Sequence, residues 1–453
     1  MKNLTAWENY SDNELKKVMR FNEDYNKFLG ASKIEREAVI NSIELAKKAG
    51  FKEFKNVKKI KAGDKYYFNN RNRSLALFVI GNNPIEEGMN LLGAHVDSPR
   101  IDLKQNPIYE DNGLVLFDTH YYGAIKKYQW VTLPLELHGT VYKKDGKAID
   151  VVIGDDENEP VLAITDLLYH LSEKQRHKDG DVVIEGEDLD ALVGSIPSKK
   201  KSVKENVIDI LKKEYNIEPE DFLSAELELV PAGKPRDLGL DRSMVLGYAH
   251  DDKVCVYTSL RAILETESPE RTSVCILTDM EEIGSVGATG AQSSFLENCI
   301  AELICLQDTY NELKLRRALA NSYMLSSDVS MAFDPIYPEV VEPKSTAYLG
   351  RGMTFNKFTG ARGKSNSSDC SASFIAKMRN VLDKNSIMYQ FCEMGKVDIG
   401  GGGTIARFVA NKNMDVLDAG VGVLSMHAPF EVVSKADVYE AYKAYKAFLK
   451  EVK

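Results

Sequence analysis

The spacing of hydrophobic residues changes along the chain and marks three regions with different predicted structures. In residues 11–50, apolar residues recur at mixed helical spacings, which predicts helices. Short apolar runs follow, and their length and polar boundaries predict strands. These runs are YYFNN, SLALFVI and MNLLGAHVDS.

The second region, from about Asn106 to Arg242, has the pattern of a β-rich unit. Its segments are short, alternate between apolar and polar residues, and are bounded by turn residues. Two segments with helical spacing interrupt them, ITDLLYHLSEKQ and ENVIDILKKEY. The predicted strands are GLVLF, WVTLPLELHGTVY, AIDVVI and VVIEGED.

After Leu246 the chain alternates between apolar strand-like runs and helical runs. This alternation is typical of a sheet covered by helices on both faces. We therefore predict an α/β fold, a three-layer sandwich formed by residues 1–105 and 246–453 and interrupted by an inserted β-rich domain at residues 106–245. The predicted strands are SVCILTD, ELICLQD and VLDAGVGVLS, and the predicted helices are VYTSLRAILE, SASFIAKMRNVL and KADVYEAYKAYKAFLK.

Length and composition are those of an ordinary globular enzyme. The chain has 453 residues, 43% hydrophobic and 28% charged, with a net charge of -10. A nucleic-acid partner is therefore not expected, and no run approaches the ~20 apolar residues of a membrane span. The six cysteines include no CxxC pair, and Cys255, Cys275 and Cys305 lie in apolar runs. We expect buried reduced thiols in a cytoplasmic protein.

The segment TDMEEIGSVG, residues 278–287, places two glutamates side by side after an apolar run. Neighbouring side chains point in different directions in a strand and on a helix, so Glu281 and Glu282 are not expected to do the same task. Such a pair is commonplace on a solvated turn. Here it ends a buried strand, which favours another interpretation: one carboxylate binds a metal and the other accepts a proton from water.

Four other segments place His or Asp at the ends of apolar runs, where ligands bind in α/β sheets. In LLGAHVDSPR, His95 and Asp97 share a strand face, so Asp97 is suited to orient His95 as a metal ligand. In GYAHDDKVC, Asp251 and Asp252 precede a helical run. They are either helix caps or, for Asp251, a bridge between two cations.

Asp328 in MLSSDVSMAFD and His427 in VLSMHAPFE are ambiguous when each is considered alone. Asp328 is a ligand or an ordinary turn residue, and His427 is a ligand or a core or loop histidine. Together, two His and three carboxylates can give each of two metals a terminal His, a terminal carboxylate and a share of a bridge, with the metals ~3.5–4 Å apart. Nitrogen and oxygen ligands without thiolate suit zinc, and also cobalt or manganese.

The order HxD, DD, EE, D, H resembles that of dinuclear metallo-aminopeptidases. The segments GAHVDSPR, GLDRSMVLGYAHDDKVC, MEEIGSVGATGA and LSMHAPFE are similar in particular to the family of aspartyl aminopeptidase and vacuolar-type aminopeptidase I. The resemblance extends from about Gly93 to the C-terminus and includes THYYGAIKKYQW. It implies two divalent metal ions per subunit, with zinc as the leading candidate.

Carried over residue by residue, the resemblance implies a role for each candidate. Glu281 would be the general base, and Asp97 would orient His95. In the resembling peptidases the peptide after the bridging aspartate is often cis, so a cis Asp251–Asp252 bond is expected. The two metals would share one aspartate, with the ligands His95, Asp251 and Asp328 for the first and Asp251, Glu282 and His427 for the second.

The resemblance also implies self-association. The inserted domain is similar to the family's dimerisation domain, and family members assemble as tetrahedral dodecamers. His170, in LLYHLSEKQ, is then expected either to reach a neighbouring subunit's active site or to pack in a helix as a core residue.

Two segments offer substrate-binding residues. NKFTGARGKSNSSD provides Lys357 as a cation for an acidic first residue of the substrate, although surface lysines are expected anyway. DIGGGGTIARF lacks the GK[ST] ending of a phosphate loop, and its glycines predict a turn before a helix. Gly401 and Gly402 could also let a substrate backbone pass close to that helix.

The expected activity is removal of the first residue, acidic or neutral, from short peptides by an activated water. A carboxypeptidase or deacylase with the same metal site is one alternative, and a non-catalytic scaffold that keeps the fold is another. All five candidate ligands and the base are present, which disfavours the scaffold.

Overall fold

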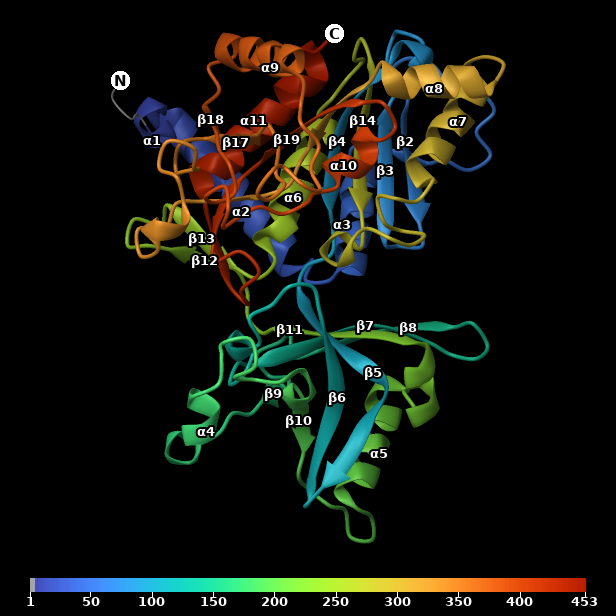
Figure 1. Ribbon diagram of the computed structural model, residues 1–453. Helices are drawn as coiled ribbons and strands as arrows, with labels where there is room; N and C mark the ends of the chain where they lie inside the picture. The colour runs from blue at the N-terminus through green and yellow to red at the C-terminus, as the bar shows by residue number, and fades with distance from the viewer. Residues whose placement is uncertain (1–4) are drawn as a thin grey trace. The chain divides into compact units, whose positions relative to one another are not determined.

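The computed structural model describes residues 5–453, which form two compact units (Figure 1). The first unit holds the described residues up to Asp97 together with Pro235–Met426 and Glu431–Lys453, and the second holds Ser98–Lys234 and His427–Phe430. The second unit thus starts before residue 106 and its main segment ends before residue 245. The early start follows from β5, which runs without interruption from Arg100 to Asp111.

A nine-stranded sheet forms the middle of the first unit, in the order β1-β2-β3-β14-β4-β15-β19-β17-β18. Its central strands β14, β4, β15 and β19 pair in parallel, so their carboxyl ends lie at one edge. In chain order the strands are β1 (Lys52–Glu53), β2 (Lys65–Asn70), β3 (Ser74–Val79), β4 (Met89–His95), β14 (Thr272–Thr278), β15 (Tyr323–Ser326), β17 (Met353–Asn356), β18 (Tyr389–Phe391) and β19 (Asp415–Gly420).

Helices cover both faces of this sheet, as the α/β alternation predicted. Along β3, Leu75 and Leu77 join one apolar cluster, whereas Ala76 and Phe78 join another on the opposite face. The predicted α/β fold is therefore confirmed, with apolar clusters on both faces of the sheet. The first cluster includes α2 (Asp12–Gly30), α3 (Glu35–Lys48), α6 (His250–Leu264), α9 (Ala372–Lys384) and α11 (Lys435–Glu451), and the second includes α7 (Phe295–Gln307), α8 (Glu312–Ala320) and α10 (Ala406–Ala410) (Figure 1).

A smaller, five-stranded sheet in the first unit leads into two of these helices. Strand β13 ends shortly before α6 begins, and β21 runs directly into α11. In this sheet the order is β12 (Arg236–Leu238), β13 (Met244–Gly247), β21 (Glu431–Ser434), β20 (Gly422–Leu424) and β16 (Ser330–Met331).

The second unit is built on a seven-stranded sheet in the order β8-β7-β11-β5-β6-β10-β9. Its paired strands are antiparallel, which agrees with the alternating sequence pattern. The strands are β5 (Arg100–Asp111), β6 (Leu114–Tyr122), β7 (Leu135–Tyr142), β8 (Ala148–Ile153), β9 (Ala163–Ile164), β10 (Ala191–Gly194) and β11 (Ala225–Pro231), with the helices α4 (Glu173–Arg176) and α5 (Val203–Tyr215).

Four local predictions are wrong. ELICLQD is the end of helix α7 rather than a strand, because a short apolar run alone does not distinguish the two. Leu303 and Ile304 are buried on this helix, whereas Cys305 is exposed and is not the buried thiol that was expected. VVIEGED contains a 3-10 turn at Gly186–Asp188 instead of a strand, and the expected helix around His170 is reduced to two short turns.

No helix within residues 5–453 combines the length and the apolar character needed to cross a membrane. All six cysteines are free thiols.

Candidate metal centre

The order of the strands brings three of the predicted site segments to the same edge of the sheet. β14 and β15 flank β4, and their register pairs Thr278 with His95 and Ser326 with Gly93. His95 is the last residue of β4. Glu281 and Glu282 follow β14 within a few residues, and Asp328 follows β15. Parallel strands thus deliver a histidine and three carboxylates to one place.

The fourth segment arrives on helix α6, which packs against β4. Asp251 and Asp252 have non-helical backbone angles, and the peptide bond between them is cis, as expected from the resemblance. Both side chains are buried, and the N-cap residue of α6 is Ala249 rather than either aspartate. The helix-cap interpretation of this pair is therefore wrong. Instead, Asp252 Oδ2 accepts the backbone N–H of His95 at 3.2 Å.

His95, Asp251 and Asp328 form a compact group of potential ligands. The Nε2 atom of His95 lies 3.1 Å from Asp251 Oδ1 and 3.8 Å from Asp328 Oδ1. One ligand atom from each residue lies within 4.8 Å of the other two. His95 and Asp251 are buried, and the Asp328 side chain is only 10% exposed. The group matches the first ligand set implied by the resemblance.

Asp97 fixes the orientation of the His95 ring. His95 Nδ1 lies 3.0 Å from the carbonyl oxygen of Asp97 and 3.3 Å from its Oδ1. Because a carbonyl oxygen only accepts, Nδ1 carries a hydrogen, so the neutral form of the ring has its lone pair on Nε2, the nitrogen that faces Asp251 and Asp328. A neutral imidazole of this tautomer is the form that binds a metal.

The same Asp97 carboxylate holds the backbone of the two glutamates. Its Oδ1 accepts the N–H of Glu281 and its Oδ2 the N–H of Glu282, both at 3.1 Å. The glutamates form the 3-10 turn η6 (Glu281–Ile283), which Met280 enters with a φ of 65°. A carboxylate oxygen of Glu282 lies within 4.8 Å of one of Asp251. The adjacent glutamates thus belong to the same site.

The remaining predicted ligand, His427, belongs to the second unit. Its Nδ1 lies 2.9 Å from the carbonyl oxygen of Ala124. The hydrogen is therefore on Nδ1 and the lone pair on Nε2, as for His95.

Burial and mutual charge shift the pKa values of this group. Burial lowers the pKa of His95, but hydrogen bonds to Asp251 and Asp97 outweigh it and raise that pKa well above its usual value. Burial, with the charge of Asp252 added, raises the pKa of Asp328 well above its usual value. Carboxylates crowded in this way repel one another, and a divalent cation between them relieves the repulsion.

The donor set fits zinc. Imidazole nitrogen and carboxylate oxygen are common zinc ligands, and the group offers no thiolate ligand. Each of the two histidines has its second ring nitrogen committed to an oxygen acceptor, the arrangement found around metal-bound histidines.

The predicted substrate-binding residues have partners of their own or are exposed. Lys357 forms an ion pair with Asp369, which also pairs with Lys364 at 2.9 Å. Gly402 donates its N–H to the carbonyl of Thr359, and a Cβ at Gly401 would lie 2.5 Å from Ala361 Cα. The glycines thus allow two loops of this chain to approach closely, before the five-residue helix α10. His170 is exposed on a 3-10 turn of the second unit, so the core-helix interpretation is wrong.

The sequence patterns did not identify two buried groups next to the candidate ligands. Glu431 Oε2 accepts the backbone N–H of Asp251 at 2.9 Å. His250 Nδ1 lies 2.6 Å from the hydroxyl of Tyr25, and burial lowers the pKa of this histidine to about 3. The partners are 180 and 225 residues apart, so no local motif indicates these contacts.

Comparison with protein families gives one match over nearly the whole chain. The model described as aminopeptidase I zinc metalloprotease (M18) matches residues 28–449. The chain belongs to the M18 family of aminopeptidases. It is a metal-dependent peptide hydrolase of the zinc type, and the family expected from the motifs is confirmed.

Relatives of known sequence or structure agree with this M18 assignment. A probable M18 family aminopeptidase 1 from Clostridium acetobutylicum is 52% identical over 452 residues, which cover 98% of this chain and 97% of the relative. The crystal structure of the M18 aminopeptidase from Thermotoga maritima superposes with a TM-score of 0.95 at 39% identity and covers 100% of both chains. A structure of the S. cerevisiae mApe1 dodecamer, at 21% identity, shares the fold with a TM-score of 0.76 over 95% of this chain and 96% of that chain.

Proposed function

We propose that this M18 aminopeptidase removes the first residue, acidic or neutral, from short peptides at a site that holds two divalent metal ions. The observation that carries the proposal is the double role of Asp97, which orients His95 and also holds the backbone of Glu281 and Glu282. One residue thereby contacts both a candidate histidine ligand and the backbone of the candidate base.

The ligands of the two ions are assigned by the resemblance of the motifs. His95, Asp251 and Asp328 would hold one ion, and their mutual distances support this set. Asp251 and Glu282, whose oxygens approach each other, would hold the other ion together with His427. The tautomer of His427, with its lone pair on Nε2, supports that role. Zinc is the first candidate and cobalt or manganese the next.

Glu281 is the proposed general base. Bound zinc ions would supply an acidified water and polarise the scissile carbonyl. Glu281 accepts the proton of the attacking water and later delivers it to the leaving amine. Its backbone N–H is held by Asp97, so the start of its side chain has a defined position relative to His95. The neighbouring Glu282 is left to bind metal, which separates the two tasks.

A panel of amino-acid anilides with metal supplied tests the activity and its side-chain preference. Asp, Glu and Leu anilides distinguish an acidic from a neutral preference. Lys357 is the candidate cation for an acidic first residue, and it forms an ion pair with Asp369. We expect hydrolysis of at least one free-amino substrate and none of the same substrate after acetylation of its amine. Equal hydrolysis of the acetylated substrate would contradict the proposal and favour a deacylase or another peptidase.

We further propose that the second unit mediates self-association into a dodecamer. Apolar side chains are unusually exposed in its segment 167–171: Leu167 is 56% exposed, Leu168 60%, Tyr169 64% and Leu171 75%. Exposed apolar clusters of this kind are typical of protein interfaces. The S. cerevisiae relative of the same fold is a dodecamer. His170 lies within this segment, so it would be carried toward a neighbouring subunit.

The cytoplasm is the proposed location. The six free cysteines suit a reducing compartment, in which short peptides would be the substrates.

A further inference from the structure

The loop that carries the candidate general base Glu281 is closed by contacts between Asp279, at its start, and Thr289, near its end. We call residues 279–290 the base loop. The backbone N–H of Asp279 donates to the carbonyl of Thr289 at 3.1 Å, and the Thr289 hydroxyl donates to Asp279 Oδ2 at 2.9 Å. Asp279 Oδ1 accepts the N–H of Met280 at 2.8 Å. One aspartate thus joins the start and the end of the base loop.

Arg73 connects this aspartate to the body of the first unit. Its Nε lies 2.8 Å from Asp279 Oδ2, and its Nη2 lies 3.3 Å from Glu35 Oε1. Glu35 is the first residue of α3, and Arg73 immediately precedes β3. The side chains are 15% exposed for Arg73, 1% for Glu35 and 0% for Asp279. Because a guanidinium presents its donors in a rigid plane, this arrangement fixes direction as well as distance.

Further bonds stiffen the base loop. Asn70, the last residue of β2, donates its side-chain N–H to the carbonyl of Ala288 at 2.8 Å. Inside the loop, the N–H of Ser285 donates to the carbonyl of Met280 at 2.6 Å. A Cβ at Gly290 would lie 2.4 Å from Ser285 O, so the loop closes tightly on itself. The base loop is thus held both by hydrogen bonds of its own and by a hydrogen bond to β2.

The base loop is attached to the rest of the first unit at two places near Glu281. On the β4 side, Asp97 accepts the N–H groups of Glu281 and Glu282. On the β3 side, Arg73 holds Asp279, two residues before Glu281. A proton-transfer group has to lie within hydrogen-bond reach of its target, and a shift of about 1 Å can lower the rate about 100-fold. Loss of the second attachment is therefore expected to lower the rate of hydrolysis.

We propose that Arg73, acting through Asp279, is a positioning residue for Glu281. It holds the base loop so that the Glu281 carboxylate meets the attacking water, and it touches neither substrate nor metal. The proposal rests on the proposed role of Glu281 as general base.

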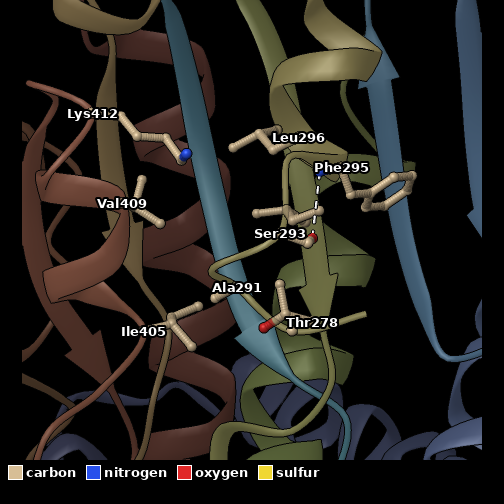
Figure 2. A pocket seen from close by; sticks show the side chains of 10 residues that line it. Thr278, Ala291, Ser293, Phe295, Leu296, Ile405, Val409 and Lys412 are labelled. Atoms are coloured by element: carbon tan, nitrogen blue, oxygen red, sulfur yellow. Dashed lines mark hydrogen bonds between the residues drawn. The ribbon is translucent and has the colours of Figure 1, made fainter. Parts of the chain in front are cut away.

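The test compares Arg73→Met with a matched loss of another partly buried ion pair near the same loop. Lys412 Nζ lies 2.6 Å from Glu297 Oε2, with side chains 17% and 16% exposed. Lys412 lines a small pocket together with Thr278, which precedes the base loop, and Ser293, which follows it (Figure 2). The variant Lys412→Met is therefore the control for local destabilisation without loss of the Asp279 contact.

For Arg73→Met we expect kcat to fall about tenfold or more, with KM and bound zinc unchanged. Lys412→Met should keep the kcat of the unaltered enzyme. Arg73→Lys should give an intermediate kcat, because a single ammonium keeps the charge but not the fork that reaches both Asp279 and Glu35. Thr289→Val, which removes only the hydroxyl bond to Asp279, should lower kcat less than Arg73→Met and serves with Arg73→Lys if Arg73→Met fails to fold.

A second measurement asks whether Arg73 acts through Glu281. In the Glu281→Gln background, Arg73→Met should cause no further loss of kcat, because the group that it positions is already disabled. The proposal is overturned if Arg73→Met behaves like Lys412→Met, if its loss is the same in both backgrounds, or if loss of zinc accounts for the effect. Full activity of Glu281→Gln alone would instead contradict the proposed function, so the two failures are distinguishable.

Discussion

Asp97 accepts the backbone N–H of Glu281 at 3.1 Å with the same Oδ1 that lies 3.3 Å from the ring nitrogen of His95. We therefore expect the orientation of a proposed metal ligand and the position of the proposed base to depend on one carboxylate. Any change at Asp97 should affect metal binding and turnover together, whereas changes at the glutamates should affect them separately.

The variant Asp97→Asn tests this coupling. An amide has only one oxygen, so its NH2 group would face one of the N–H donors that the carboxylate now accepts. We expect both zinc affinity and kcat to fall, each about 10–100-fold. Metal content after dialysis and steady-state kinetics measure the two effects. A loss of kcat with full zinc affinity would show that Asp97 does not hold the ligand.

The adjacent glutamates should separate under substitution. Glu281→Gln should retain zinc and lose about 10²–10⁴-fold in kcat, because only the proton acceptor is removed. Glu282→Gln should lower the bound zinc per subunit, and added zinc should restore part of its activity. Metal analysis and kinetics on both variants provide the comparison. Identical metal content and identical losses in the two variants would refute the division of tasks.

Removal of metal should lower stability as well as activity. Burial raises the pKa of Asp252 and of Asp328, and the charge of Asp251 adds to the rise at Asp252 as the charge of Asp252 does at Asp328. Without a cation their repulsion opposes folding, so a chelator should lower the midpoint of thermal unfolding. Zinc should restore both the midpoint and the activity. An unchanged midpoint in metal-free protein would argue against a buried cation among these residues.

The exposed segment 167–171 should be required for assembly. Leu171→Glu places a charge on a side chain that is 75% exposed, so it should leave the folded chain intact. Multi-angle light scattering should show a dodecamer for the unaltered protein and smaller species for the variant. Leu313→Glu, at a 55% exposed position of α8, is the control. A monomeric unaltered protein at micromolar concentration would contradict the proposed assembly.

Asp437 should make stability decrease as pH rises toward 8. Its carboxylate accepts the N–H groups of Gly350 and Gly352, both at 2.7 Å, but burial dominates and raises its pKa to about 8. An unfolded aspartate has a pKa of about 3.9, so between these values the folded chain binds more protons than the unfolded chain. Protonation therefore favours the folded state below pH 8, and this contribution is lost as pH increases.

The variant Asp437→Asn removes this titration. Its free energy of unfolding should depend less on pH between 5 and 8, by up to about 1.4 kcal/mol per pH unit. Urea unfolding at several pH values, with matched zinc, measures the two slopes. The variant will be less stable overall because an amide cannot accept both N–H groups, so the slope decides. Equal slopes would show that Asp437 titrates normally.

Much of the site was predictable because its signals are local. A His, Asp or Glu at the end of an apolar run can be recognised without knowing which strands are neighbours. This pattern correctly predicted that His95, Glu281 and Asp328 lie at or just after strand ends. The length and order of the motifs then identified the family, which the comparison with M18 aminopeptidases confirmed. Where the pattern was short and apolar throughout, as in ELICLQD, it did not distinguish a strand from a helix.

Tertiary structure decided which of these residues meet and what holds them. Only the pairing of β4 with both β14 and β15 brings the three strand ends together. Asp97 contacts His95, two residues away in the sequence, and also Glu281, 184 residues away. Glu431 accepts the backbone N–H of Asp251 across 180 residues. The contact of Arg73 with Asp279 is of the same kind. Buried polar groups find partners wherever the packed chain brings them, so sequence determined the chemistry of the site, and packing determined its geometry.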